Sequence, residues 1–163
     1  MFQMPVSSSA VAEMFQADVL KEDEKWYPHS TLGKLRPLMF DLSGGSWVTL
    51  LKVDGGGTLG KHYHSAAVSA WTLDGAWGYR EYEWVARAGS FVYEPPGHTH
   101  TLYVHPSENK MLVLFQIQGP LIYLDDKNNP IDYADAFTHL ERYREYCLRT
   151  PGLGEEWVRS LIR

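Results

Sequence analysis

Short apolar runs broken by turn residues fill the middle of the chain. Residues 38–42 and 47–53 are mostly aliphatic, aromatic or β-branched, and residues 43–46 between them read Ser-Gly-Gly-Ser. This pattern predicts a β-hairpin, because such side chains suit strands and glycine suits a tight reversal. Similar runs follow at short intervals, with turn residues such as Asp74-Gly75 between them; they cover residues 68–73, 77–85, 91–93, 101–104, 111–118 and 121–124. Strands in this arrangement predict an all-β barrel or jelly roll.

The later part of the chain follows another pattern. Residues 134–149 carry apolar side chains at helical spacing with charges between them, namely Ala134, Phe137, Leu140, Tyr143 and Cys147. This predicts a helix packed against the barrel, with Asp132 or Asp135 as its cap, followed by a short helix near residues 155–162. The predicted organisation is an irregular N-terminal arm at 1–36, a barrel at 37–125 and a helical extension at 131–163.

Composition narrows the function class. The 163 residues are 44% hydrophobic, enough for one domain with a real core. The net charge of −5, with no cluster of Lys or Arg, argues against nucleic acid as a partner. The single Cys147 excludes an intrachain disulfide framework, and no apolar run approaches the roughly 20 residues of a membrane span. We therefore expect a cytoplasmic protein that does not bind membranes.

Candidate chemistry lies in two glycine-containing segments, residues 56–64 and 89–100. The first ends in His62-Tyr63-His64, and the second ends in His98-Thr99-His100. On a strand, a two-residue spacing points both imidazoles of the first segment to the same face. A third imidazole from a distant strand would complete a set of neutral donors suited to Fe, Zn, Ni, Cu or Mn, with positions left open for substrate or water.

The two segments resemble the motifs of the cupins, which are small jelly-roll β-barrels. The first cupin motif reads Gly, five residues, His-x-His, and the second reads Gly, five residues, Pro-x-Gly, two residues, His; the matching positions are Gly56, His62 and His64, then Gly89, Pro95, Gly97 and His100. The resemblance implies a single-domain cupin with a metal at His62, His64 and His100. His98 would lie in the turn, where it is a candidate catalytic acid or base, a substitute ligand or a bystander.

The first cupin motif usually continues to a glutamate, which this chain lacks. The family's position falls at Val68 or Ser69. Two replacements, Glu81 and Glu83, lie on the next predicted strand, where alternation puts both on one face. If that face is inward, a carboxylate can reach the metal; if it is outward, both are solvated charges. The residues alone leave both alternatives open.

Within the cupins, the chain resembles the 2,4'-dihydroxyacetophenone dioxygenase group over roughly residues 35–120. The resemblance is carried by residues 47–52, 71–77 and 93–97, and by the His-Thr-Leu at 100–102. It implies an Fe(II) enzyme that splits a carbon-carbon bond of a small hydroxyketone with dioxygen. It also implies Glu81 as a catalytic and metal-binding carboxylate, because Glu81 ends a Trp-x-Tyr-x-Glu pattern.

Two further implications follow. A related acetylacetone-cleaving dioxygenase uses three histidines alone, which extends the expected substrates to diketones. The chain also resembles the anti-sigma-factor cupins, which implies an alternative function as a metal-binding sensor without turnover. An edge strand and the aromatic-rich arm lead us to expect a homodimer or a higher homo-oligomer.

Overall fold

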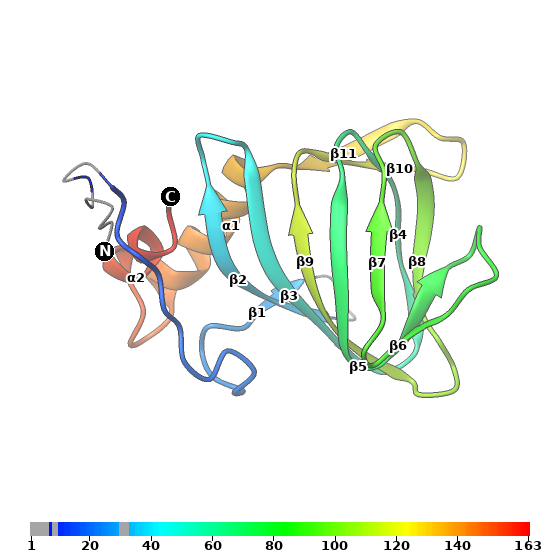
Figure 1. Cartoon of the computed structure of the whole chain (residues 1–163), viewed down its shortest axis with the longest axis horizontal. Coiled ribbons are helices and arrows are strands. Elements are labelled where there is room, and N and C mark those ends of the chain that lie inside the picture. The colour runs from blue at the N-terminus through cyan, green and yellow to red at the C-terminus, as the bar shows by residue number, and fades with distance from the viewer. Residues whose placement is uncertain (1–6, 8–9, 30–32) are drawn as a thin grey trace, which may run out of the picture.

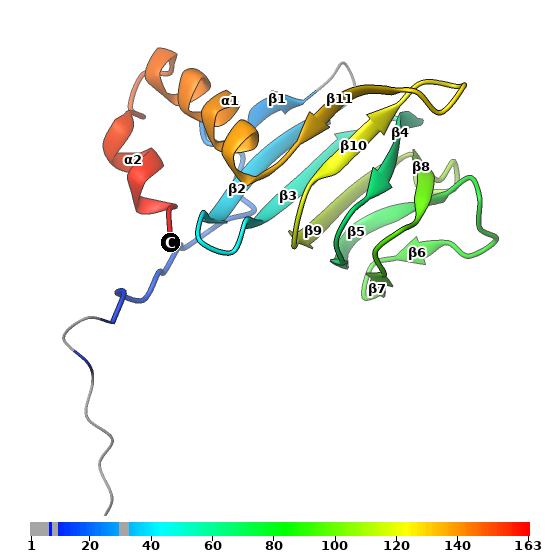
Figure 2. The ribbon, with the colours of Figure 1, turned by 90° about the horizontal axis from the view of Figure 1, so that it is seen from above.

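The computed structural model describes residues 7, 10–29 and 33–163 of the chain. Its strands form one curled antiparallel sheet in the order β1-β2-β3-β9-β5-β8-β4-β10-β11, and β6 and β7 pair with β5. Figures 1 and 2 show the curled sheet and the two helices gathered beside its β1 and β2 end. The strands are β1 Tyr27–His29, β2 Gly33–Asp41, β3 Ser46–Asp54, β4 Gly57–His64, β5 Val68–Tyr79, β6 Ala86–Arg87, β7 Phe91–Glu94, β8 Thr99–Val104, β9 Lys110–Ile117, β10 Leu121–Leu124 and β11 Pro130–Ala134.

The predicted all-β jelly-roll fold is confirmed, and so is its first hairpin. Strands β2 and β3 pair from Asp41 opposite Ser46, and residues 42–45, which include Ser43, Gly44 and Gly45, make the turn. Strand β9 then pairs with β3 from Trp47 opposite Ile117 to Asp54 opposite Lys110. The sheet also takes in β1 and β11, which lie outside residues 37–125. The division into arm, barrel and extension stays a prediction.

The prediction of a hairpin turn at Asp74-Gly75 is wrong. Both residues lie inside β5, which runs from Val68 to Tyr79 and changes register against β9 between Thr72 and Asp74. Gly75 adopts a φ of +73°, and a Cβ there would lie 2.1 Å from the carbonyl oxygen of Lys110. Glycine is therefore required beside this β-bulge. Asp-Gly resembles a hairpin turn in the sequence because bulges and tight turns both use glycine at positive φ.

The prediction of a strand across residues 77–85 is correct for residues 77–79 and wrong for residues 80–85. Strand β5 ends at Tyr79, and residues 80–85 form a turn and an irregular segment before the two-residue strand β6. The backbone N–H of Arg80 still donates to the carbonyl oxygen of Thr101, and that of Tyr82 donates back to Tyr79. Glu81 and Glu83 consequently do not share one face of a strand.

The helical extension follows the predicted pattern with a later start. Helix α1 spans Ala136–Arg149 and α2 spans Glu155–Ser160, whereas Ala134 belongs to β11. Asp135 caps α1, since its side chain accepts from the backbone N–H of Thr138 at 2.7 Å. No helix in the described part of the chain is long and apolar enough to cross a membrane.

The arm and the helices pack on each other at one end of the sheet. Tyr143 of α1 is fully buried, its ring lies 5.3 Å from that of Tyr27, and its hydroxyl donates to the carbonyl oxygen of Lys25. The C-terminus is tied to β2, because Phe40 exchanges backbone hydrogen bonds with Leu161 and Arg163. Helix α1 therefore has a fixed place over this end of the barrel, with consequences for the cavity described below.

Candidate metal centre

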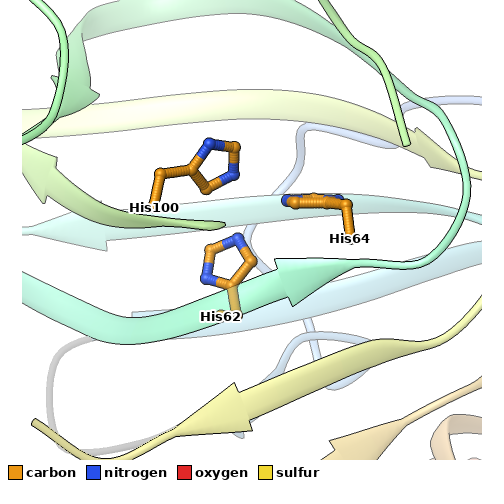
Figure 3. Close-up of side chains that lie close together, drawn as sticks. All are labelled: His62, His64 and His100. Atoms are coloured by element: carbon orange, nitrogen blue, oxygen red, sulfur yellow. The ribbon is translucent and has the colours of Figure 1, made fainter. Parts of the chain in front are cut away.

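Three histidines from two neighbouring strands converge inside the barrel. His62 and His64 lie on β4, His100 lies on β8, and His62 faces His100 directly in the β4–β8 ladder. Their ring centroids are 4.6 to 5.0 Å apart, and one nitrogen of each lies within 4.8 Å of the others. Figure 3 shows the three rings turned toward a common point. Strand alternation and cross-strand pairing together produce this geometry.

The three imidazoles are buried and mostly unpaired. His62, His64 and His100 are 8%, 2% and 1% exposed, and both ring nitrogens of His64 and of His100 have no hydrogen-bond partner in the described structure. His62 differs, since its Nδ1 lies 2.9 Å from the carbonyl oxygen of Gly60. A carbonyl can only accept, so Nδ1 carries the proton and Nε2 keeps its lone pair. This backbone contact fixes the tautomer that a metal ligand needs.

Burial also keeps two of these rings neutral. Loss of solvation lowers the pKa of His62 to about 4, against the opposing effect of the Gly60 carbonyl. Loss of solvation, reinforced by the neighbouring histidines, lowers the pKa of His64 to about 2. Neutral imidazole is the form that binds metals.

A carboxylate that sequence reasoning missed lies beside the imidazoles. Glu94 ends β7, is 4% exposed, and places Oε2 at 3.1 Å from Nε2 of His64 and 3.4 Å from Nε2 of His100. Neither approach has hydrogen-bond geometry, so Oε2 is unpaired as well. The signal was present in β7, because alternation places Glu94 on the same face as the half-buried Val92.

Tyr79 holds both Glu94 and His100. Its hydroxyl donates to Oε1 of Glu94 at 2.7 Å, and its ring stacks on the His100 imidazole with centroids 3.4 Å apart. Burial, followed by the nearby Glu94 carboxylate, raises the pKa of Tyr79 well above its usual value, so the hydroxyl remains a donor. The side chains around the three imidazoles are therefore fixed in place by packing and hydrogen bonds.

The other predicted site residues lie outside this group. Glu81 is exposed, and its carboxylate accepts from both the backbone N–H and the hydroxyl of Thr101, at 2.8 and 2.9 Å. Glu83 is exposed on the same turn. His98 is exposed and its Nδ1 lies 2.8 Å from the Tyr82 hydroxyl. The two glutamates are exposed because the chain leaves β5 at Tyr79, and His98 is exposed because it lies in the loop between β7 and β8.

His98 contributes to the site through its backbone. Its carbonyl oxygen accepts from the backbone N–H of His64 at 2.9 Å, and the N–H of Gly97 donates to the carbonyl of His64 at 2.8 Å. Gly97 has a φ of +92°, which turns the chain between β7 and β8. The loop of the second motif is thus fastened to the strand of the first.

A large cavity opens beside the histidines. It has a volume of about 760 Å³, and His62 and His64 form part of its wall together with the aliphatic and aromatic side chains of Leu35, Leu51, Val68, Leu102, Phe115 and Ile117. At the helical end, the wall includes His139 and Arg142 of α1. A volume in this range holds a small organic molecule.

The donor set fits a transition metal. Unpaired polar atoms in a buried site are costly, and here the imidazole nitrogens and the Glu94 oxygen are left unpaired around one point. Three neutral imidazoles, with a carboxylate beside them, are donors that Fe, Zn, Ni, Cu and Mn accept. His62, His64 and His100 could therefore hold such an ion, with ligand positions left for molecules from the cavity.

Solved structures of other proteins share the fold described above. A solved RmlC-like cupin protein from Ralstonia eutropha JMP134 is 33% identical, with a TM-score of 0.74 over 77% of this chain and 82% of that one. An acetylacetone dioxygenase from Acinetobacter johnsonii is 17% identical, with a TM-score of 0.73 over 86% of this chain and 97% of that one. At that identity, the likeness shows the fold alone. No curated protein matches the sequence.

A sequence match over most of the sheet shows the family to which this chain belongs. Residues 16–121 match the ChrR cupin-like domain, and this range contains all three histidines and Glu94. The barrel, the two motifs and the match agree, and the chain belongs to the family of ChrR cupin-like domains.

Proposed function

We propose that the protein is an Fe(II)-dependent dioxygenase that cleaves a carbon-carbon bond of a small hydroxyketone or β-diketone. The observation that carries the proposal is the set of three buried imidazoles with unpaired nitrogens, two of which, His62 and His64, lie on the wall of a mostly apolar cavity of about 760 Å³. An acetylacetone dioxygenase has the same fold, so a barrel of this kind can house chemistry of this class.

The protein ligands in this proposal are His62, His64 and His100. Fe(II), when bound, supplies Lewis acidity and the redox chemistry that dioxygen requires. Three protein ligands leave positions open, as at other catalytic metal sites. Zn, Ni, Cu and Mn remain alternatives, because affinity for imidazole does not select iron.

The chain's own residues would orient the substrate and move its proton. The apolar wall excludes water and packs against the carbon skeleton of the ketone. Oε2 of Glu94, unpaired and beside two of the imidazoles, is placed to accept the proton that the substrate loses on forming its enolate or alkoxide. Tyr79 keeps that carboxylate oriented through Oε1.

The overall reaction balances with dioxygen as the only co-substrate. A terminal hydroxyketone plus O₂ gives a carboxylic acid and formic acid, and a β-diketone plus O₂ gives a carboxylic acid and a 1,2-dicarbonyl. In each case one carbon-carbon bond breaks and both oxygen atoms enter the products.

His98 has a supporting role in the proposed site, since its backbone carbonyl accepts a hydrogen bond from the backbone N–H of His64. The homo-oligomeric state and cytoplasmic location stay predictions.

A second candidate function is a metal-binding sensor module without turnover. The match to the ChrR cupin-like domain favours this function, because it agrees with the resemblance of the chain to the anti-sigma-factor cupins. The two functions share the metal site and differ in whether oxygen is consumed.

One experiment separates them. Protein purified and loaded with Fe(II) without oxygen is analysed for metal, and oxygen uptake is then measured with a panel of aryl hydroxyketones and β-diketones. About one iron per chain with uptake and a carboxylic acid product supports the dioxygenase, and the same iron without uptake supports the sensor. His64→Ala should lose both signals. His105→Ala, at a histidine bonded to Ser107 outside the site, should keep both.

A further inference from the structure

The helical end of the cavity contains a polar group that the proposed chemistry does not use. His139 of α1 lines the cavity, is 5% exposed, and has no partner for Nε2 in the part of the chain that the structure describes. Its Nδ1 lies 3.1 Å from the Tyr27 hydroxyl. A buried polar atom left unpaired on a cavity wall is costly, and a ligand group that pairs with it removes the cost.

Hydrogen-bond counting assigns the tautomer of His139. If the Tyr27 hydroxyl donates to Nδ1, the only group left unpaired is an Nε2–H donor. The opposite direction leaves both the Tyr27 O–H and the Nε2 lone pair unsatisfied. Burial lowers the pKa of His139 to about 3, so the ring is neutral and carries one proton. The cavity wall therefore presents an N–H donor, which suits an oxygen acceptor on a ligand.

Cationic side chains surround the same cavity. Lys61, Arg142 and Arg149 are among its described lining residues, against the single acidic side chain of Asp132. Arg142 donates to the Asp132 carboxylate at 3.2 Å and to the carbonyl oxygen of Tyr133, and its side chain is 45% exposed. Arg149 pairs with Glu145 at 3.8 Å, whereas the bonds of Arg142 to Asp132 and Tyr133 all use Nη2. Arg142 is therefore the cation on this wall best able to meet an anion, in contrast to the chain's net charge of −5.

We propose that this end of the cavity is a carboxylate subsite formed by His139 and Arg142. Resting on the proposed function, the inference specifies the substrate class as an elongated keto acid: its hydroxyketone or diketone end lies at the histidines of β4 and β8, and its carboxylate accepts from Nε2–H of His139. Helix α1 begins at Ala136, beyond the residues 16–121 that match the family. Both residues of the subsite therefore lie outside the part of the chain that the family model covers.

The test compares two probes that differ only in the carboxylate, 1-phenylbutane-1,3-dione and its 4-carboxyphenyl analogue. Binding is measured without oxygen by quenching of tryptophan fluorescence, on the full-length protein as purified with its metal. The readout is the ratio of the two dissociation constants. Because no turnover is involved, failure of the oxygen-uptake experiment would leave this ratio measurable, and the two failures are distinguishable.

Wild type should bind the carboxylated probe more tightly by about 10-fold to 100-fold, the range of a hydrogen bond to a charged group. His139→Leu should bring the ratio near one, and His139→Gln, which restores an N–H near the position of Nε2, should recover part of the preference. His105→Leu, outside the cavity, should leave the ratio unchanged.

Two results would overturn the subsite. One is a wild-type protein that prefers the uncharged probe or does not distinguish the two, and the other is an unchanged preference in His139→Leu. If the buried substitution prevents folding, Arg142→Gln, at an exposed side chain, replaces it. That variant should lower the preference several-fold, and an unchanged preference there would count equally against the proposal.

Discussion

Replacing Glu94 by glutamine should weaken metal binding by about 10-fold to 100-fold. Glutamine keeps the shape of the side chain and still offers an oxygen to the Tyr79 hydroxyl, so the barrel should remain folded. The change removes one negative charge 3.1 Å from Nε2 of His64 and 3.4 Å from Nε2 of His100, in a position that is 4% exposed. The expected loss is therefore mainly electrostatic.

The magnitude follows from the burial of the charge. Two unit charges about 4 Å apart attract by about 4 kcal/mol at an effective dielectric constant near 20. Part of this is offset, since the carboxylate is desolvated in the apoprotein and the amide oxygen of glutamine retains a dipole. A net loss of about 1.4 to 2.8 kcal/mol remains, equal to the 10-fold to 100-fold change expected of residues that support metal ligands.

The assay is competition with a chromophoric chelator, using Zn(II) so that oxygen plays no part. Glu81→Gln is the matched control. Its carboxylate is exposed and bonded to Thr101, so its removal should change the metal affinity by about 2-fold at most. Equal affinities of Glu94→Gln and wild type, or a larger loss in Glu81→Gln, would refute the reasoning. The second outcome would restore Glu81 as the carboxylate of the site.

Two further predictions concern stability. Gly75→Ala should lower the free energy of unfolding by about 2 kcal/mol or more, because the methyl group would meet the Lys110 carbonyl, whereas Gly45→Ala should cost only the roughly 1 kcal/mol of a positive φ; urea titrations that rank them equally would disprove the bulge. His139 has a pKa of about 3 when folded and about 6.5 when unfolded, so the stability it contributes is present above pH 6.5 and is lost as the pH falls toward 3. Urea midpoints of wild type and His139→Gln should converge over that window, and parallel pH profiles would contradict this.

The metal centre could be predicted from the sequence because its geometry is local. A two-residue spacing on a strand places His62 and His64 on one face, and the spacing of the second motif selects His100 over His98. The structure places the same three imidazoles together and leaves His98 exposed. Strand periodicity found the pair His62 and His64, and the resemblance to the second cupin motif supplied His100.

The carboxylate could not be placed in the same way. Its prediction at Glu81 depended on residues 77–85 forming one strand, and the chain instead turns at residue 80. Asp74-Gly75 misled the prediction for a related reason, since a bulge and a hairpin turn both require glycine at positive φ. Strand β5 pairs with β9 through Asp74 and Gly75, and with β8 as far as Tyr79. These pairings between distant segments decide that the chain continues at residue 74 and turns at residue 80.

The sequence also did not predict that helix α1 would form part of the cavity wall. Helical spacing correctly predicted Leu140, Tyr143 and Cys147 on its buried face, whereas Phe137 is exposed. It did not predict that His139 on that face would line a cavity. That depends on how the arm, through Tyr27, holds the helix against the sheet. Such a contact joins residues more than a hundred positions apart, and local patterns do not encode it.

The most direct test of the metal centre is the metal content of the purified protein and three variants, measured by elemental analysis beside circular dichroism. Wild type and His98→Ala should each retain about one transition-metal ion per chain, whereas His64→Ala and His100→Ala should be empty but folded, since both imidazoles belong to the histidine cluster and their ring nitrogens make no hydrogen bonds that support the core strands. An empty His98→Ala beside a fully loaded His100→Ala would contradict the account.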